Sequence, residues 1–274
     1  MTTARDQLGT DVPLTALTGD QLRARVARAQ LYLIRMEPLD GWAGARPELH
    51  AEHARYLHKL EAEGRLYGCG PLDEATARPG TALAIVAAAS RKEAELIALS
   101  EPFHRSGLRR NSVRGHTMNE GVACYVGRAL ARRMEALGES FDPHAGSLAP
   151  EAPVTGERPA GARLHLMSLE PGEKPRPPED TQTGFDHFVW LRENEMRARL
   201  MSCGPVEPAA PLPPGVWGGG LAVVAGSREE VEAIAAAEPS GRAGYRKLSV
   251  AGWTLTHGLA APIGRALEAL SRLP

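Results

Sequence analysis

The chain has 274 residues, a formal net charge of −1 at pH 7 and three cysteines. This balance gives no electrostatic footprint for nucleic acid or an anionic membrane, and no apolar run approaches the roughly 20 residues that span a bilayer. The first residues lack the apolar core of a signal peptide, and the cysteines form no CxxC pair. We therefore expect a cytoplasmic protein with two domains of ordinary size.

Strand and helix patterns alternate along the first half, after an N-terminal extension at residues 1–30. In that extension we expect residues 1–17 to be disordered and residues 18–30 to form a short helix. Strand patterns follow at 31–37, 65–69, 83–87 and 109–117, and helical patterns follow from 49 to about 64, from Ser90, and at 123–137. The order β-α-β-β-α-β with an added helix is the ferredoxin-like motif.

The second half repeats the first. Residues 101–130 align without a gap with residues 238–267 at an offset of 137, and 15 of these 30 positions are identical. The strand patterns recur at 164–169, 199–203, 221–225 and 246–254, and the final helix recurs at 260–273. Ser90 and Ser227 each precede a helix and have glutamate three residues later, which predicts a capping box in both halves.

This duplication predicts the domain organisation and the fold class. The first domain is expected at residues 31–138 and the second at 163–274, joined by a linker at 139–162 that is rich in proline and glycine. A four-stranded sheet with helices on one side leaves its other face bare, so that face must be covered. We expect an α+β protein in which two tandem ferredoxin-like units, each with an added C-terminal helix, pack sheet to sheet as a pseudo-dimeric α+β barrel. The chain would be a monomer with this internal pseudo-dimer, or a homodimer.

A set of spaced motifs carries a family resemblance. His53 begins the pattern His-x-x-Tyr-Leu, Gly70-Pro71 ends the next strand, and a serine-capped helix ends in Glu101-Pro-Phe103. This order resembles the YCII-related domain over residues 31–117, and less closely over 164–254. The resemblance implies a dimeric α+β barrel fold, a pocket near a His–acid pair, and lyase or isomerase chemistry on small cyclic compounds. The sequence departs from the family pattern in having glutamate rather than aspartate before the proline, and Ser240 in place of phenylalanine.

Two His–Glu pairs are the leading catalytic candidates. His53 and His187 occupy the helix stripe that should face the sheet, and a histidine there can exchange protons near neutral pH. Glu101 and Glu238 would orient the imidazoles and raise their basicity. The alternatives are a hydrogen-bonded core histidine and a turn-forming acidic residue before proline.

Six further residues that both halves retain are candidates for substrate binding: Tyr56, Cys69, Arg109, Trp190, Cys203 and Arg246. The arginines could pair with a carboxylate or face solvent, and the aromatic residues could pack in the core. The cysteines could be nucleophiles, although small buried strand residues are the favoured interpretation.

A metal site at His50, His53 and Glu101 is disfavoured, because the second half has Gly184 where the first has His50. We expect no metal and no cofactor.

The function expected from these features is a cofactor-independent acid–base enzyme of the lyase or isomerase type. It would act on a small cyclic or natural-product-like compound, with the first half as the stronger candidate for activity. The alternative is a non-catalytic small-ligand-binding or accessory protein in which the His–Glu pairs are structural. A cofactor-free oxygenase is a third option, by fold analogy alone. The small-molecule substrate would be the only partner, with no nucleic acid and no membrane.

Overall fold

A computed structural model of the chain describes residues 3–5, 11–13, 18, 26–144 and 161–272. The elements of the first half are β3 (Ala29–Pro38), η2 (Trp42–Gly44), α2 (Pro47–Ala62), β4 (Leu66–Pro71), β5 (Ala82–Val86), α3 (Arg91–Ser100), α4 (Pro102–Arg105), β6 (Arg109–Met118) and α5 (Cys124–Leu137). Those of the second half are β7 (Ala162–Pro171), α6 (Gln182–Met196), β8 (Leu200–Pro205), β9 (Gly220–Val224), α7 (Arg228–Ala236), α8 (Pro239–Arg242), β10 (Arg246–Leu255) and α9 (Ala261–Ser271).

The N-terminal extension differs from its prediction. Residues expected to be disordered include the short antiparallel pair β1 (Thr3–Arg5) and β2 (Asp11–Pro13). The short helix expected at 18–30 falls mostly on residues outside the described part, and its last two residues begin β3. Most of the predicted linker, residues 145–160, also lies outside the described residues.

Each half forms a four-stranded antiparallel sheet, and the two sheets have the same strand order. The order is β4-β5-β3-β6 in the first half and β8-β9-β7-β10 in the second. The longest pairs are β3 with the edge strand β6 and β7 with the edge strand β10, each in register over ten residues. The predicted pair of ferredoxin-like units is confirmed.

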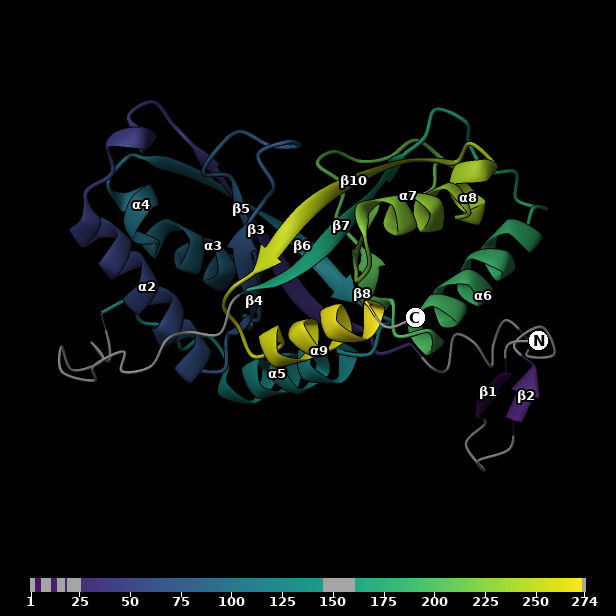
Figure 1. The fold of residues 1–274 in the computed structure, drawn as a ribbon, viewed down its shortest axis with the longest axis horizontal. Coiled ribbons are helices and arrows are strands. Elements are labelled where there is room, and N and C mark those ends of the chain that lie inside the picture. The colour runs from purple at the N-terminus through teal and green to yellow at the C-terminus, as the bar shows by residue number, and fades with distance from the viewer. Residues whose placement is uncertain (1–2, 6–10, 14–17, 19–25, 145–160, 273–274) are drawn as a thin grey trace.

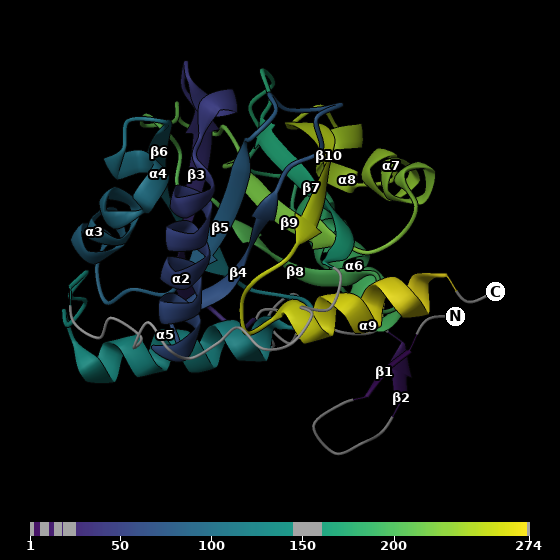
Figure 2. The ribbon, with the colours of Figure 1, turned by 60° about the vertical axis from the view of Figure 1, so that its left-hand side comes forward.

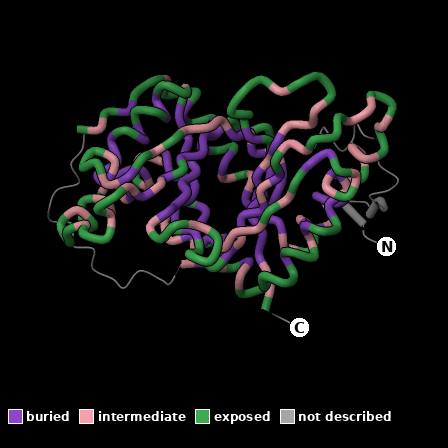
Figure 3. Tube along the Cα trace, turned by 90° about the horizontal axis from the view of Figure 1, so that it is seen from above, coloured by how far each residue is buried: buried purple, intermediate pink, exposed green. Residues whose placement is uncertain are grey.

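The two sheets pack face to face and share one apolar core (Figure 1). Along β3, Leu31 and Leu33 point into this shared core, whereas Tyr32 and Ile34 point to the helices of their own half. This alternation is the period of two that a strand imposes. Helices α2, α3, α6 and α7 cover the outer faces, whereas α5 and α9 lie across one end of the two sheets and add Leu130 and Leu267 to the shared core (Figures 1 and 2). Buried residues gather in the middle of the molecule in Figure 3.

The edges of the two sheets meet at isolated bridges. Cys69 bridges to His257 and Glu120 bridges to Cys203, so β4 adjoins the end of β10, and β8 adjoins the end of β6. The eight strands are therefore two abutting sheets and not one closed, continuously hydrogen-bonded barrel.

The repeated Gly-Pro motif has a steric reason at these junctions. A Cβ on Gly70 would lie 1.7 Å from the Thr254 carbonyl oxygen, and one on Gly204 would lie 1.8 Å from the Thr117 carbonyl oxygen. Any side chain would push the two halves apart, so glycine is required at both positions.

Helix capping agrees with the prediction in one half and in part in the other. Ser227 and Glu230 form a complete capping box at the start of α7. Ser90 caps α3 through the backbone N–H of Glu93, but the Glu93 carboxylate accepts hydrogen bonds from Ala89, Ser140 and Phe141 instead. Among the described residues, no helix is both long and apolar enough to cross a membrane.

Candidate functional site

The structure brings both His–Glu pairs together with the same geometry. His53 Nδ1 lies 2.7 Å from Glu101 Oε1, and His187 Nδ1 lies 2.7 Å from Glu238 Oε1. The histidines come from α2 and α6. The glutamates are the N-caps of the short helices α4 and α8, which the sequence pattern did not predict.

Each carboxylate therefore has two roles, because it caps a helix and also holds an imidazole. Glu238 accepts hydrogen bonds from the backbone N–H groups of Ser240 and Gly241 and from the Ser240 hydroxyl. Burial alone would raise the pKa of Glu238, but the His187 and Ser240 hydrogen bonds outweigh it and lower the pKa to about 2. The carboxylate is therefore ionised at neutral pH, and His187 Nδ1 must donate to it. In the neutral imidazole, this leaves Nε2 unprotonated and able to accept a proton or bind a metal.

Glu101 has the same arrangement. Burial raises its pKa, while His53, Arg109 and the backbone N–H of His104 lower it, and the net shift is downward. Neither His53 nor His187 forms a hydrogen bond through Nε2 with any described residue.

The two retained arginines are buried, which contradicts the alternative of solvent-facing strand residues. The Arg109 guanidinium lies 4.1 Å from the centre of the Trp42 ring, and that of Arg246 lies 4.5 Å from the centre of the Trp217 ring. Arg246 Nε also donates to the Gly218 carbonyl oxygen. Each arginine thus stacks on a tryptophan beside its glutamate, although the two tryptophans come from different loops.

The space beside the histidine differs between the halves. In the first half, the Phe103 ring centre lies 5.0 Å from that of His53, and Trp42 and His50 pack on the same phenyl ring. The second half has Ser240 where the first has Phe103, and Gly184 where it has His50. Gly184 lines open space that is taken up by His50 in the first half, whereas Ser240 is fully buried and its hydroxyl donates to Glu238.

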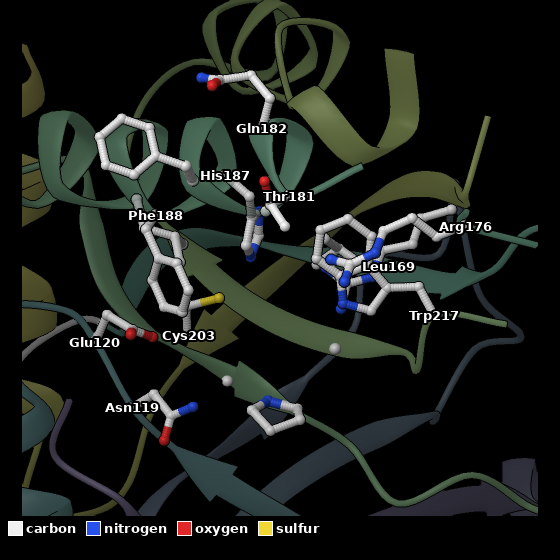
Figure 4. Close-up of a pocket in the computed structure, with 17 residues that line it drawn as sticks. Asn119, Glu120, Leu169, Arg176, Thr181, Gln182, His187, Phe188, Cys203 and Trp217 are labelled. Atoms are coloured by element: carbon white, nitrogen blue, oxygen red, sulfur yellow. The ribbon is translucent and has the colours of Figure 1, made fainter. Parts of the chain in front are cut away.

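A cavity of about 600 Å³ occupies this space beside His187. Its walls include Arg176, Phe185, Phe188, Cys203, Trp217 and Arg246. In Figure 4 the His187 ring extends from α6 into the cavity, with Arg176 and Trp217 to one side and Cys203 and Glu120 to the other. The sequence favoured the first half as the active one, whereas this cavity lies in the second.

The remaining candidate residues are two cysteines and two aromatic residues. Burial raises the pKa of the Cys203 thiol, which opposes nucleophilic use, and Cys69 is likewise buried. The Tyr56 hydroxyl donates to the Ile97 carbonyl oxygen, and the Trp190 ring stacks on His187 with ring centres 6.0 Å apart. No three His, Cys, Asp or Glu side chains of the described residues gather as a metal site, so the grouping around His50 is not supported.

Most of the cavity lining was not predicted from the sequence, including Glu120, Arg176 and Trp217. Arg176 and Trp217 lie in loops that carry no repeat signal. Glu120 could have been found, because the offset of 137 aligns it with His257, a second titratable residue.

Comparison with known families finds a match in the first half. The family model of the YCII-related domain matches residues 31–114, the segment that contains His53 and Glu101. This segment is therefore similar to the YCII-related domain. The second half repeats the same strand order and the same His–Glu pair. A search of curated proteins finds no match.

Several solved structures are similar over nearly the whole chain. A haem-binding protein from Thermus thermophilus is 14% identical, with a TM-score of 0.48, and the match covers 86% of this chain and 94% of that one. A mutant chlorite dismutase from Candidatus Nitrospira defluvii, in complex with cyanide, is 8% identical, with a TM-score of 0.47, and the match covers 92% and 98% of the two chains.

These comparisons contradict the expectation of a cofactor-independent lyase or isomerase. The similar structures are described as a haem-binding protein and a chlorite dismutase, and neither description names a lyase or an isomerase.

Proposed function

We propose that the cavity beside His187 binds a flat, anionic cofactor of the haem class, and that His187 would hold its metal ion. The observation that carries the proposal is the fixed imidazole. Glu238 holds Nδ1 at 2.7 Å, and the ring extends into a cavity of about 600 Å³. That volume lies within the usual range for small-molecule and cofactor sites.

The donor set fits such a cofactor. A histidine that binds a metal almost always donates its other ring N–H to a carboxylate or carbonyl, which fixes the tautomer and raises the basicity of the ligating nitrogen. Histidine is also the axial ligand of haem in several protein classes. The His187–Glu238 pair has this arrangement, and the ionised state of Glu238 favours it.

The other residues that line the cavity suit the charged edge and the flat ring of such a cofactor. Arg176 and Arg246 bring two guanidinium groups to the cavity, both within 5 Å of the Trp217 ring centre. Arg246 has Glu238 beside it as a counter-charge, which leaves Arg176 to pair with a carboxylate of the ligand. Phe185, Phe188 and Trp217 supply apolar and aromatic surface for a flat ring system.

A bound haem would supply one-electron and oxygen chemistry. The residues of this chain would bind and orient it. Glu238 would keep the His187 ring in one tautomer and one orientation, Arg176 would hold the anionic edge, and the aromatic walls would exclude water.

The test is titration of the purified protein with hemin, followed by the Soret absorption band. We expect one hemin per chain and a shifted band in the wild type. His187→Ala should lose the shifted band, and His53→Ala is the matched control, because it removes the equivalent histidine from the filled half. The proposal is wrong if hemin does not bind, or if both variants bind it as the wild type does.

A further inference from the structure

Glu120 is a buried carboxyl group on the wall of the His187 cavity that the first half supplies. It follows β6 and is 2% exposed. Its backbone is fixed by bonds with Cys203, since Cys203 N donates to Glu120 O at 2.8 Å and Glu120 N donates to Cys203 O at 3.1 Å. Its carboxyl oxygen Oε1 has no hydrogen-bond partner among the described residues, although the side chain lines the cavity. An unsatisfied buried carboxyl group is costly, so a partner that the protein alone does not provide is expected there.

The charged and titratable groups around Glu120 come from three elements. Arg192 and Glu195 lie on α6 and pair with each other, which neutralises most of their charge. Cys203 lies on β8 and Cys124 on α5. Burial raises the pKa of Glu120 to about 7, with Arg192 lowering it and Glu195 raising it.

The same position is used in the other half. The offset of 137 places His257 where Glu120 stands, and His257 bridges to Cys69 as Glu120 bridges to Cys203. Each His–Glu pair thus has a titratable residue from the opposite half at the junction of the two sheets. Only the Glu120 copy faces the described cavity of about 600 Å³.

We propose that Glu120 is the proton-exchanging group of this cavity: its neutral form donates a hydrogen bond to an anion bound beside His187, and loss of the proton weakens binding of that anion. The inference rests on the cavity being a ligand site, as in the proposed function, but not on haem as the ligand. The protonated carboxyl is a donor, whereas the carboxylate is an acceptor only and repels an anion. Anion binding should therefore be strong at low pH and weak at high pH.

The test uses 1-anilinonaphthalene-8-sulfonate, an aromatic anion, whose affinity is measured by fluorescence at pH 5.5 and pH 8.5. Wild-type protein should bind the dye at least about tenfold more weakly at pH 8.5 than at pH 5.5. A tenfold change in affinity corresponds to a shift of about one unit in the pKa of the coupled group when the dye binds. Glu120→Gln keeps the shape and a hydrogen-bond donor but cannot ionise, so it should bind at both pH values within about threefold of the wild type at pH 5.5. Gly184→Trp, which places a large side chain at a position that lines the cavity, identifies any dye bound elsewhere.

Three results overturn the inference: no dye binding that Gly184→Trp removes, equal wild-type affinity at both pH values, or an unchanged pH dependence in Glu120→Gln. Infrared difference spectra give a second measurement that needs no ligand. The protonated carboxyl band of the wild type should disappear between pH 5.5 and 8.5 and be missing in Glu120→Gln. Failure of hemin to bind, with the dye behaving as expected, would reject the proposed cofactor and leave the role of Glu120 standing.

Discussion

Replacing Glu120 by glutamine should change how the stability of the protein depends on pH. The folded-state pKa of Glu120 is raised to about 7 from the ordinary value of 4.5, because the side chain is buried. The folded protein therefore holds this proton more tightly than the unfolded chain does. The resulting contribution to the free energy of unfolding is complete below pH 4.5 and is lost as the pH rises through 7.

The magnitude follows from the width of that interval. Each pH unit is worth about 1.36 kcal/mol for one proton, so the wild type should lose about 3 kcal/mol between pH 4.5 and 7 through this group alone. The Glu120→Gln variant has no ionisable group at this position, so it should not lose this stability as the pH rises. Such a difference is a large fraction of the 5–15 kcal/mol that typically stabilises a folded domain.

Urea unfolding at pH 5 and pH 8, followed by tryptophan fluorescence, measures the effect. Between pH 5 and pH 8, the unfolding free energy of the wild type should fall by about 2–3 kcal/mol more than that of Glu120→Gln. Glu52→Gln, at an exposed position of α2, is the control and should shift by less than about 0.5 kcal/mol. Parallel pH profiles for Glu120→Gln and wild type would refute a neutral buried carboxyl group.

Three other variants test the cavity and the sheet junction. Glu238→Gln should destabilise the protein by about 3 kcal/mol at pH 7 in urea unfolding, because a folded-state pKa of about 2 gives stability that is present above pH 4.5 and lost as the pH falls towards 2. Hemin affinity should also fall by about 10- to 100-fold, since the imidazole loses its orienting partner. Gly184→Trp should abolish hemin binding while the far-ultraviolet circular dichroism stays unchanged, because Gly184 lines the cavity and is only partly buried. Gly204→Ala should lower the unfolding free energy in urea by about 2 kcal/mol or more, since its Cβ would lie 1.8 Å from the Thr117 carbonyl oxygen; Gly218→Ala, whose Cβ would meet only an atom at 3.9 Å, should have little effect.

The fold was predictable because its determinants are local and occur twice. Strand alternation, the serine caps and the constant offsets gave the element order, and the bare sheet faces gave the packing. The short helices α4 and α8 were missed because glutamate before proline predicts an extended turn residue, and four-residue helices carry no apolar period. The N-terminal strand pair was missed for the same reason, since three-residue strands have too few positions to show alternation.

Only the part of the site that depends on residue type could be predicted from the sequence. Repetition identified His187 and Glu238, because both were retained at equivalent positions. The cavity depends on the absence of a large side chain, and Gly184 signals this only when it is compared with His50 of the first half. Glu120 acquires its raised pKa from burial at the junction, which no local pattern encodes.

Duplication explains why the open site needs both halves. The sheet of the second half forms one side of the His187 cavity, but another side comes from Asn119 and Glu120, which follow β6 in the first half. That strand end is held against β8 by the bridge to Cys203, and the close approach requires Gly204. The first half can therefore fill its own pocket with aromatic side chains and still contribute to the site, because its edge completes the cavity of the second. An isolated second half would retain the His187–Glu238 pair but would lack the carboxyl group opposite it.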